Sequence, residues 1–170
     1  MKKYIAIACV LVMCLGILTG CMERVDNTVD NNAPVGVTLV YGENKIDVTA
    51  GQWEPKRTQI KTVDASLPGT TKEYEFTGVT LASLMEIAGA TDCTEIIVRS
   101  TDGWEAVVAA ADALAYDIMI TDDYVGGKDI PADAGGPIKM VFPATEHPEL
   151  NETYDAWAWQ WYVGEVEFVK

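Results

Sequence analysis

The clearest change of pattern in this chain lies within residues 73–89, which read EYEFTGVTLASLMEIAG. The first part, residues 73–77, alternates polar and apolar side chains, as a half-buried strand does. From Leu81 onward, apolar residues recur at the spacing of one helix face, with Thr80 as a suitable N-cap and Gly89 just past the end. The stretch therefore predicts a strand that runs directly into a short helix.

Strand patterns dominate on both sides of this stretch. They cover residues 35–41, 45–48, 58–63, 95–100, 104–109, 117–121, 138–142 and 163–169. The pair Asp102-Gly103 between two of these runs favours a hairpin, because Gly readily adopts a positive φ. A second short helix is expected near residues 111–115, and turns are expected at residues 125–128 and 134–137. Together these patterns predict a mixed, β-rich α+β domain.

The first twenty residues have the features of a bacterial export signal. Lys2 and Lys3 precede an apolar run. Residues 18–21, Leu-Thr-Gly-Cys, then resemble the lipobox of bacterial lipoproteins, in which the Cys thiol carries lipid and becomes the mature N-terminus. We therefore expect residues 1–20 to be a signal peptide and Cys21 to be the lipidation site. The alternative is an uncleaved transmembrane anchor, but the run is short for the roughly 20 residues that a span needs.

Residues 21–34 lack apolar periodicity and are rich in Asn and Asp. They predict a flexible tether between the lipid and a folded domain at residues 35–170. Such a protein would be held at the extracytoplasmic face of the cell membrane by its lipid.

The chain is strongly acidic. It contains 12 Lys and Arg against 26 Asp and Glu, a formal net charge of −14, and loss of the signal would remove Lys2 and Lys3 as well. This charge makes nucleic acid an implausible partner. It also predicts that lipid, and not a basic surface, holds the domain at an anionic membrane.

Cysteine usage limits the redox and metal chemistry of the domain. Of the four Cys, Cys9 and Cys14 lie in the expected signal and Cys21 is the expected lipid attachment, which leaves Cys93. We expect no intramolecular disulfide and no Cys-based metal site. Cys93 itself has the pattern of a small apolar residue at the start of a strand.

Four signals occur in a recognisable order along the domain. They are FTGVTLASLM at residues 76–85, STDGW at residues 100–104, GGPIKMVFP at residues 135–143, and Trp161 with the final strand. This order resembles the oxidoreductase molybdopterin-binding domain of the sulfite oxidase family, over residues 73–170. The resemblance implies the β-rich α+β fold of that family.

In full-length members of that family, molybdenum is held by a pterin dithiolene and one protein Cys thiolate. That Cys lies in the segment before the Thr-Gly-Val signal, yet residues 61–77 of this chain contain no Cys. Ser66 is the nearest small polar residue, and a hydroxyl is a harder and less readily deprotonated ligand than a thiol. Molybdopterin is thus implied by the resemblance alone, and we expect no bound metal or cofactor.

Other family positions also differ. Trp104 stands where sulfite-oxidising members have an active-site Tyr, and Lys139 stands where they have an Arg. The loop at residues 144–152 replaces a region that supplies further basic contacts in those members. The basic residues that remain for a cofactor phosphate are Arg99, Lys128 and Lys139.

His147 is the single His of the chain, and its type is compatible with a base, a redox-cofactor ligand or a loop residue. Its position between Glu146 and Pro148 favours solvent exposure in a polar loop. Because no nucleophile or partner base is recognisable nearby, we assign no catalytic residue.

The alternating residues Trp157, Trp159 and Trp161 would face one side of a strand. Such a face is either a wall of the core or an exposed stacking surface. Core is the usual role, but three Trp on one short strand face exceed what a small core needs, so this face is the best candidate for a ligand or partner surface. The full set of candidate pocket residues is Ser66, Arg99, Trp104, Lys139, His147, Trp157, Trp159 and Trp161.

Three functions are compatible with these patterns. The favoured one is a non-catalytic ligand-binding or accessory lipoprotein that keeps the family fold without its metal thiolate, with a small ligand of unknown identity. The second is a molybdopterin-dependent oxidoreductase with an atypical ligand set. The third is a docking subunit for a redox partner in a membrane electron-transfer complex.

Overall fold

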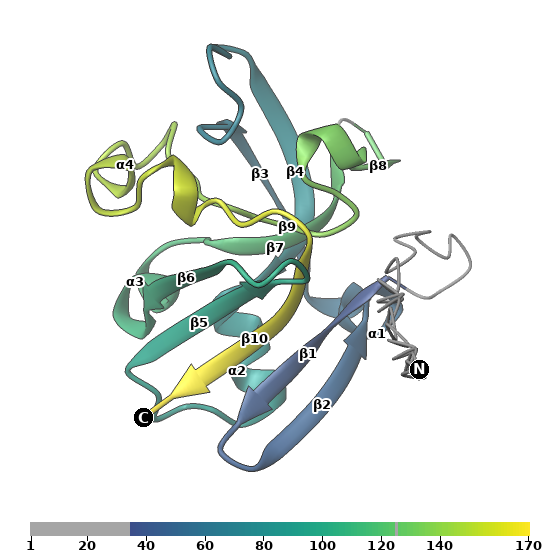
Figure 1. Ribbon diagram of the computed structural model, residues 1–170, viewed down its shortest axis with the longest axis vertical. Helices are drawn as coiled ribbons and strands as arrows, with labels where there is room; N and C mark the ends of the chain where they lie inside the picture. Colours follow the sequence, from purple (N-terminus) through teal and green to yellow (C-terminus); the bar gives the residue numbers. More distant parts are fainter. Residues whose placement is uncertain (1–34, 125) are drawn as a thin grey trace, which may run out of the picture. The chain divides into compact units, whose positions relative to one another are not determined.

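The computed structural model describes residues 35–124 and 126–170 (Figure 1). The expected signal peptide, the lipidation site Cys21 and the tether at residues 21–34 lie outside these residues. Within the described part of the chain, no helix is both long enough and apolar enough to span a bilayer.

The secondary structure is rich in strands and short in helix. In chain order the elements are β1 (Gly36–Tyr41), β2 (Asn44–Thr49), α1 (Ala50–Trp53), η1 (Glu54–Lys56), β3 (Arg57–Val63), β4 (Glu73–Thr80), α2 (Leu81–Ala88), β5 (Glu95–Ser100), β6 (Glu105–Ala109), α3 (Ala110–Ala115), β7 (Met119–Tyr124), β8 (Lys128–Asp129), η2 (Ala132–Ala134), β9 (Lys139–Val141), α4 (Leu150–Thr153), η3 (Ala156–Ala158) and β10 (Val163–Val169). The prediction of a β-rich α+β fold is confirmed.

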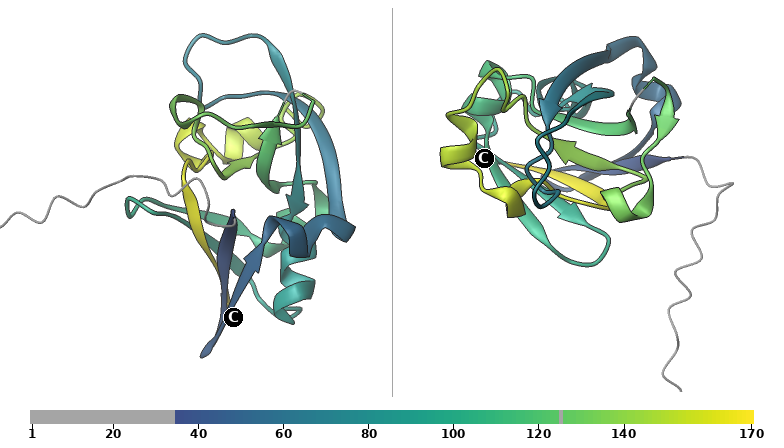
Figure 2. Two further views of the ribbon diagram at one scale, coloured as in Figure 1. Left: turned by 90° about the vertical axis from the view of Figure 1, so that its right-hand side faces the viewer. Right: turned by 90° about the horizontal axis from the view of Figure 1, so that it is seen from above.

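The first sheet has the strand order β2-β1-β10-β5-β6. The pairing of β1 with β10 is parallel, and its other strand pairs are antiparallel. Burial alternates along β5, where Ile96 and Val98 are buried and Ile97 and Arg99 are partly exposed. One face of this sheet therefore forms the core, and α2 covers it (Figure 2).

The second sheet has the order β3-β4-β7-β8, and β9 pairs with β7 as well. Gly78 of β4 allows β4 and β7 to approach closely, because a Cβ there would lie 2.1 Å from the carbonyl oxygen of Ile120. Strand β4 leads without a loop into α2, where Thr80 Oγ1 accepts a hydrogen bond from the Ser83 backbone N–H at 3.1 Å. The strand-to-helix prediction for this stretch is confirmed.

The predicted hairpin at Asp102-Gly103 is also confirmed, because β5 and β6 pair antiparallel on either side of it. Cys93 is a free, buried residue just before β5, and burial raises the pKa of its thiol. This placement agrees with the expected apolar role of Cys93.

The expectation that Trp157, Trp159 and Trp161 share one strand face is wrong. Asp155 accepts a hydrogen bond from the Trp157 backbone N–H at 3.0 Å and thereby caps the 3-10 helix η3. Strand β10 begins only at Val163. Alternating spacing therefore does not place these three rings on one side, and Trp157 is 75% exposed while Trp159 is 1% exposed.

Three segments that are distant in sequence meet at the end of the first sheet where β10 begins. They are the β3–β4 connection, the β5–β6 hairpin and the chain before β10. Val163 pairs with Ser100 at this end, so the start of β10 and the hairpin turn are adjacent.

Candidate functional site

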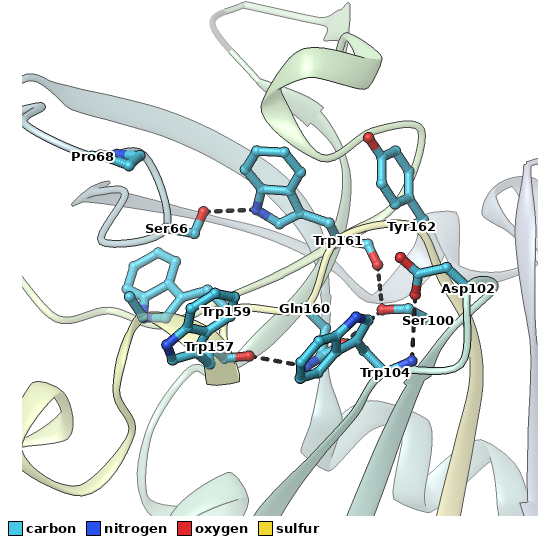
Figure 3. Close-up of a pocket in the computed structure, with 11 residues that line it drawn as sticks. Ser66, Pro68, Ser100, Asp102, Trp104, Trp157, Trp159, Gln160, Trp161 and Tyr162 are labelled. Atoms are coloured by element: carbon cyan, nitrogen blue, oxygen red, sulfur yellow. Dashed lines mark hydrogen bonds between the residues drawn. The ribbon is translucent and has the colours of Figure 1, made fainter.

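A pocket of about 340 Å³ lies where these three segments meet, and we call it the aromatic pocket (Figure 3). Four of its lining side chains are Trp and one is Tyr. The lining residues are Ser66, Pro68, Ser100, Asp102, Trp104, Ala156, Trp157, Trp159, Gln160, Trp161 and Tyr162. Five of the eight residues proposed from the sequence, Ser66 and the four Trp, are therefore brought together.

Trp104 and Trp157 form the exposed rim of the aromatic pocket. Their ring centroids lie 5.8 Å apart with an angle of 17° between the planes. Trp104 is 61% exposed and Trp157 is 75% exposed, so both rings present apolar surface to solvent. Trp159, in contrast, is buried and packs against Phe142 with a centroid distance of 5.4 Å.

Ser66 lines the aromatic pocket, and its hydroxyl is hydrogen-bonded to three neighbouring side chains. Its hydroxyl donates to Asp64 Oδ1 at 2.6 Å. The same oxygen accepts from Lys139 Nζ at 2.7 Å and from Trp161 Nε1 at 2.8 Å (Figure 3). A Ser hydroxyl has one donor proton and two acceptor lone pairs, so its whole hydrogen-bonding capacity is used within the protein.

Lys139 lies behind Ser66 and does not line the aromatic pocket. Its ammonium group is fully buried, forms an ion pair with Asp64 and donates to the Ala134 carbonyl oxygen at 3.2 Å. Burial lowers the pKa of Lys139, and the charge of Asp64 opposes that shift. With three acceptors around it, the ammonium group has every proton bonded, and its charge is balanced by one carboxylate.

The position of Trp161 depends on Gly135, which packs against its ring, and on Tyr162, which follows it in the chain. A Cβ at Gly135 would lie 2.6 Å from Trp161 Cγ, and Gly135 has a φ of +95°, so a residue without a side chain is needed below the ring. The next residue, Tyr162, has a φ of +53°, which is unusual for a bulky residue and costs about 1–3 kcal/mol. The Tyr162 hydroxyl donates to the Ala132 carbonyl at 2.8 Å and its backbone N–H donates to the Gly135 carbonyl at 3.0 Å. These bonds hold the strained backbone, and with it the wall of the aromatic pocket.

Ser100 and Gln160 supply the other buried polar groups of the lining, and they bond to each other. The Ser100 hydroxyl lies 2.6 Å from Gln160 Oε1 and 2.5 Å from the Trp161 carbonyl oxygen. Gln160 Nε2 donates to the Trp157 carbonyl oxygen at 3.0 Å. The hydrogen-bonding groups of Ser100 and Gln160 therefore already have partners within the protein.

Arg99 does not belong to the aromatic pocket. It lies on the outer face of the first sheet, where it forms ion pairs with Glu105 at 2.6 Å, Glu165 at 2.8 Å and Glu167 at 2.6 Å. Hydrogen bonds to these carboxylates, that to Glu105 foremost, raise the pKa of Arg99. Alternation along β5 turns Arg99 to the face opposite the core, so it cannot serve as the phosphate partner that the sequence proposed.

His147 is also absent from the lining of the aromatic pocket. It is half-buried rather than fully exposed, with its ring edge-on to Tyr116 at a centroid distance of 4.8 Å. Its Nδ1 lies 3.3 Å from Glu149 Oε1. The loop that carries it folds back on Pro143, because the His147 backbone N–H donates to the Pro143 carbonyl oxygen at 2.9 Å.

Sequence reasoning missed four residues that shape the site: Asp64, Asp102, Gln160 and Tyr162. Asp102 belongs to the hairpin motif and Tyr162 directly follows Trp161, so the signal for both was visible. Nothing in the sequence paired Asp64 with Lys139, which are 75 positions apart. Among the described residues, no group of three or more His, Cys, Asp and Glu is arranged to hold a metal ion.

Comparison with known proteins agrees with the architecture. The family model described as "Oxidoreductase molybdopterin binding domain" matches residues 48–147, which is more than half of the chain. Ser66, Trp104 and Lys139 lie inside this range, whereas residues 156–162 of the aromatic pocket lie outside it. A search of curated proteins finds no significant match.

Among solved structures, the fold is similar to the sulfane dehydrogenase SoxCD from Paracoccus pantotrophus. The two share a TM-score of 0.56 at 14% sequence identity, and the match covers 79% of this chain and 38% of that one. This chain thus corresponds to well under half of the matched protein. The family match and the shared fold lead to one conclusion: the chain belongs to the oxidoreductase molybdopterin-binding domain family.

Proposed function

We propose that this protein is a non-catalytic ligand-binding module, in which the aromatic pocket binds a small ligand that is not an anion. The observation that carries this proposal is the bonding of Ser66. Its hydroxyl already donates to Asp64 and accepts from Lys139 and Trp161.

The donor set around Ser66 does not fit a molybdenum centre. A metal ligand must offer a lone pair, and both lone pairs of Ser66 Oγ are used by N–H donors. One of those donors is a buried ammonium group, which would be repelled by the metal as a like charge. The residues present therefore offer no thiolate and no available hydroxyl at this position.

The lining also does not fit the phosphate of a pterin cofactor. Phosphates are usually held by Arg and Lys through charge-assisted hydrogen bonds. Among the residues that the structure describes, no Arg or Lys lines the aromatic pocket, and Asp102 is the one charged residue of its lining. An anionic ligand would meet a carboxylate there and no balancing positive charge.

The dimensions and the surface of the aromatic pocket suit a small, largely apolar ligand. A volume of about 340 Å³ is at the lower end of the range of small-molecule sites. Trp and Tyr rings bind flat or apolar groups with little loss of side-chain entropy. The exposed Trp104 and Trp157 at the rim are available for such contact.

The expected place of action is the outer side of a membrane. The Leu-Thr-Gly-Cys sequence at residues 18–21 supports lipid attachment at Cys21, and the net charge of −14 supports a domain that stands off an anionic surface.

A screen of small molecules sorted by charge tests the binding function. The melting temperature of the purified protein should rise with some neutral or cationic compounds and not with anionic ones of the same size. Trp104→Ala should remove the rise, while Trp53→Phe, a buried change away from the aromatic pocket, should keep it. Stabilisation by anionic compounds alone, unaffected by Trp104→Ala, would contradict the proposal.

A further inference from the structure

Building on the binding function proposed above, we propose that the aromatic pocket recognises an organic cation without N–H groups, such as a quaternary ammonium group. The carrying observation is that four Trp rings and one isolated carboxylate line the same cavity (Figure 3).

The rings supply the first part of the recognition. The face of an aromatic ring carries negative charge density, and Trp attracts cations most strongly of the aromatic side chains. Trp104, Trp157, Trp159, Trp161 and Tyr162 all line the aromatic pocket. Trp161 already has a cation near its ring in this structure, because Lys139 Nζ lies 5.1 Å from its centroid.

The buried ammonium group of Lys139 does not make the aromatic pocket cationic. Its charge is balanced by Asp64 in a buried ion pair, and Ser66 and Trp161 separate the pair from the cavity. The pair contributes no net charge to the aromatic pocket.

Asp102 supplies the second part of the recognition. It is an exposed carboxylate in the β5–β6 turn, and its Oδ1 accepts a hydrogen bond from the Trp104 backbone N–H at 3.3 Å. Among the described residues it forms no ion pair, in contrast with Glu105 of the same hairpin, which bonds Arg99. A net charge of −14 on the chain adds a long-range field of the same sign.

The bonded polar groups explain why the cation should lack N–H donors. Ser66, Ser100 and Gln160 use their hydrogen-bonding groups within the protein. A sugar or a primary amine needs several partners when it leaves water, and unmet hydrogen bonds weaken binding. A trimethylammonium group has no such requirement, because its charge is spread over methyl groups that can contact ring faces.

A pair of probes of equal shape separates charge from shape. Choline and its neutral isostere 3,3-dimethyl-1-butanol differ in one atom, N⁺ against C. Their dissociation constants would be measured by calorimetry on the full chain in a maltoside detergent, which carries no choline group. Choline should bind roughly tenfold more tightly than the isostere, and its advantage should shrink as salt is added.

Two variants in the aromatic pocket and one control variant outside it locate the effect. Asp102→Asn should weaken choline binding several-fold and leave the isostere unchanged. Glu95→Gln makes the same change of charge at the far end of β5 and should leave both probes unchanged. Trp104→Leu should weaken choline binding as well.

Equal affinity for the two probes would overturn the inference and leave the binding function in place, since shape alone would then decide. Absence of choline binding would overturn it too. The proposed function itself is decided separately, by the charge-sorted screen and by the cofactor content of the protein.

Discussion

At the scale of single residues, Ser66, Asp64 and Lys139 form one hydrogen-bonded cluster beside the aromatic pocket. The Ser66 hydroxyl is bonded to a buried ion pair and to Trp161. The sequence showed the missing Cys and named Ser66, Lys139 and Trp161 separately. It could not show that they touch, because the contacts join segments that the fold alone brings together.

The buried ion pair makes a prediction about stability. Lys139→Met should destabilise the fold by about 3–5 kcal/mol, because it leaves the Asp64 carboxylate buried without its counter-charge. Asp64→Asn combined with Lys139→Met should recover much of that loss, since Asn is neutral and its oxygen can still accept from the Ser66 N–H. Urea unfolding followed by Trp fluorescence measures both values. If Lys139→Met alone were as stable as the wild type, the ion pair would not be buried as described.

Tyr154 makes a prediction about pH. Burial, followed by its hydrogen bond to Asp112 at 2.5 Å, raises the pKa of Tyr154 to about 12, whereas an unfolded Tyr ionises near pH 10. Between these values the unfolded state releases a proton that the folded state keeps, so stability falls as pH rises through this window. The loss should amount to roughly 2–3 kcal/mol by pH 12.

Tyr154→Phe removes this contribution. The variant should be less stable at pH 7, by about 1–2 kcal/mol, because the Asp112 and Ala109 partners lose a hydrogen bond. Its stability should then fall less steeply than that of the wild type between pH 10 and pH 12. Parallel curves for the two proteins would contradict the raised pKa.

At the scale of elements, the sequence was most informative where local pattern and tertiary contact agree. The strand-to-helix stretch at residues 73–88 has alternation, a cap and a helical spacing that all favour the observed β4 and α2. The hairpin at Asp102-Gly103 depends on the turn alone. Such features need no knowledge of the rest of the chain.

The prediction of a strand at Trp157, Trp159 and Trp161 was wrong because the local pattern and the tertiary contacts disagree there. Alternating spacing alone does not make a strand: residues Ala156–Ala158 form the 3-10 helix η3, and β10 begins only at Val163. Asp155 instead caps η3, and Trp159 enters the core beside Phe142. The prediction that Arg99 and His147 line the pocket was wrong for a similar reason, because the fold decides whether these side chains point toward the aromatic pocket.

Gly78 provides a test of the contact between β4 and β7. Gly78→Ala should destabilise the protein by about 1–3 kcal/mol, because the new Cβ would lie 2.1 Å from the Ile120 carbonyl oxygen and push the strands apart. Gly51→Ala is a matched control, since nothing lies within 4 Å of a Cβ there. Thermal unfolding of both variants measures the difference. Equal melting temperatures would show that the two strands are not packed as described.

At the scale of the whole molecule, the lipobox-like sequence at residues 18–21 predicts a lipid anchor, and the acidic charge predicts that the domain itself does not bind an anionic membrane. Cys21→Ser should abolish labelling by radioactive palmitate and release the protein from membranes, because the thiol is the expected site of acylation. Fractionation of cells that express each form measures the outcome. Continued labelling and membrane retention of the variant would show that the lipoprotein interpretation is wrong.

The order of four short sequence motifs was enough to predict the family, and the family match and the shared fold agree with that prediction. The use of the aromatic pocket was not readable in this way. It depends on which atoms already bond one another, and that is a property of the assembled fold rather than of any motif.

We propose that the Ser66 cluster and the aromatic pocket of this family member do not hold a molybdenum cofactor. The most direct test is the amount of molybdenum and tungsten per chain, together with pterin fluorescence after oxidation, in protein purified from a host that makes the cofactor. A cofactor-containing member of the family, prepared in the same way, serves as the positive control. The bonding of Ser66 and the lining without Arg or Lys predict far less than one metal per chain and no pterin signal. Metal near one per chain with a pterin signature would contradict the claim.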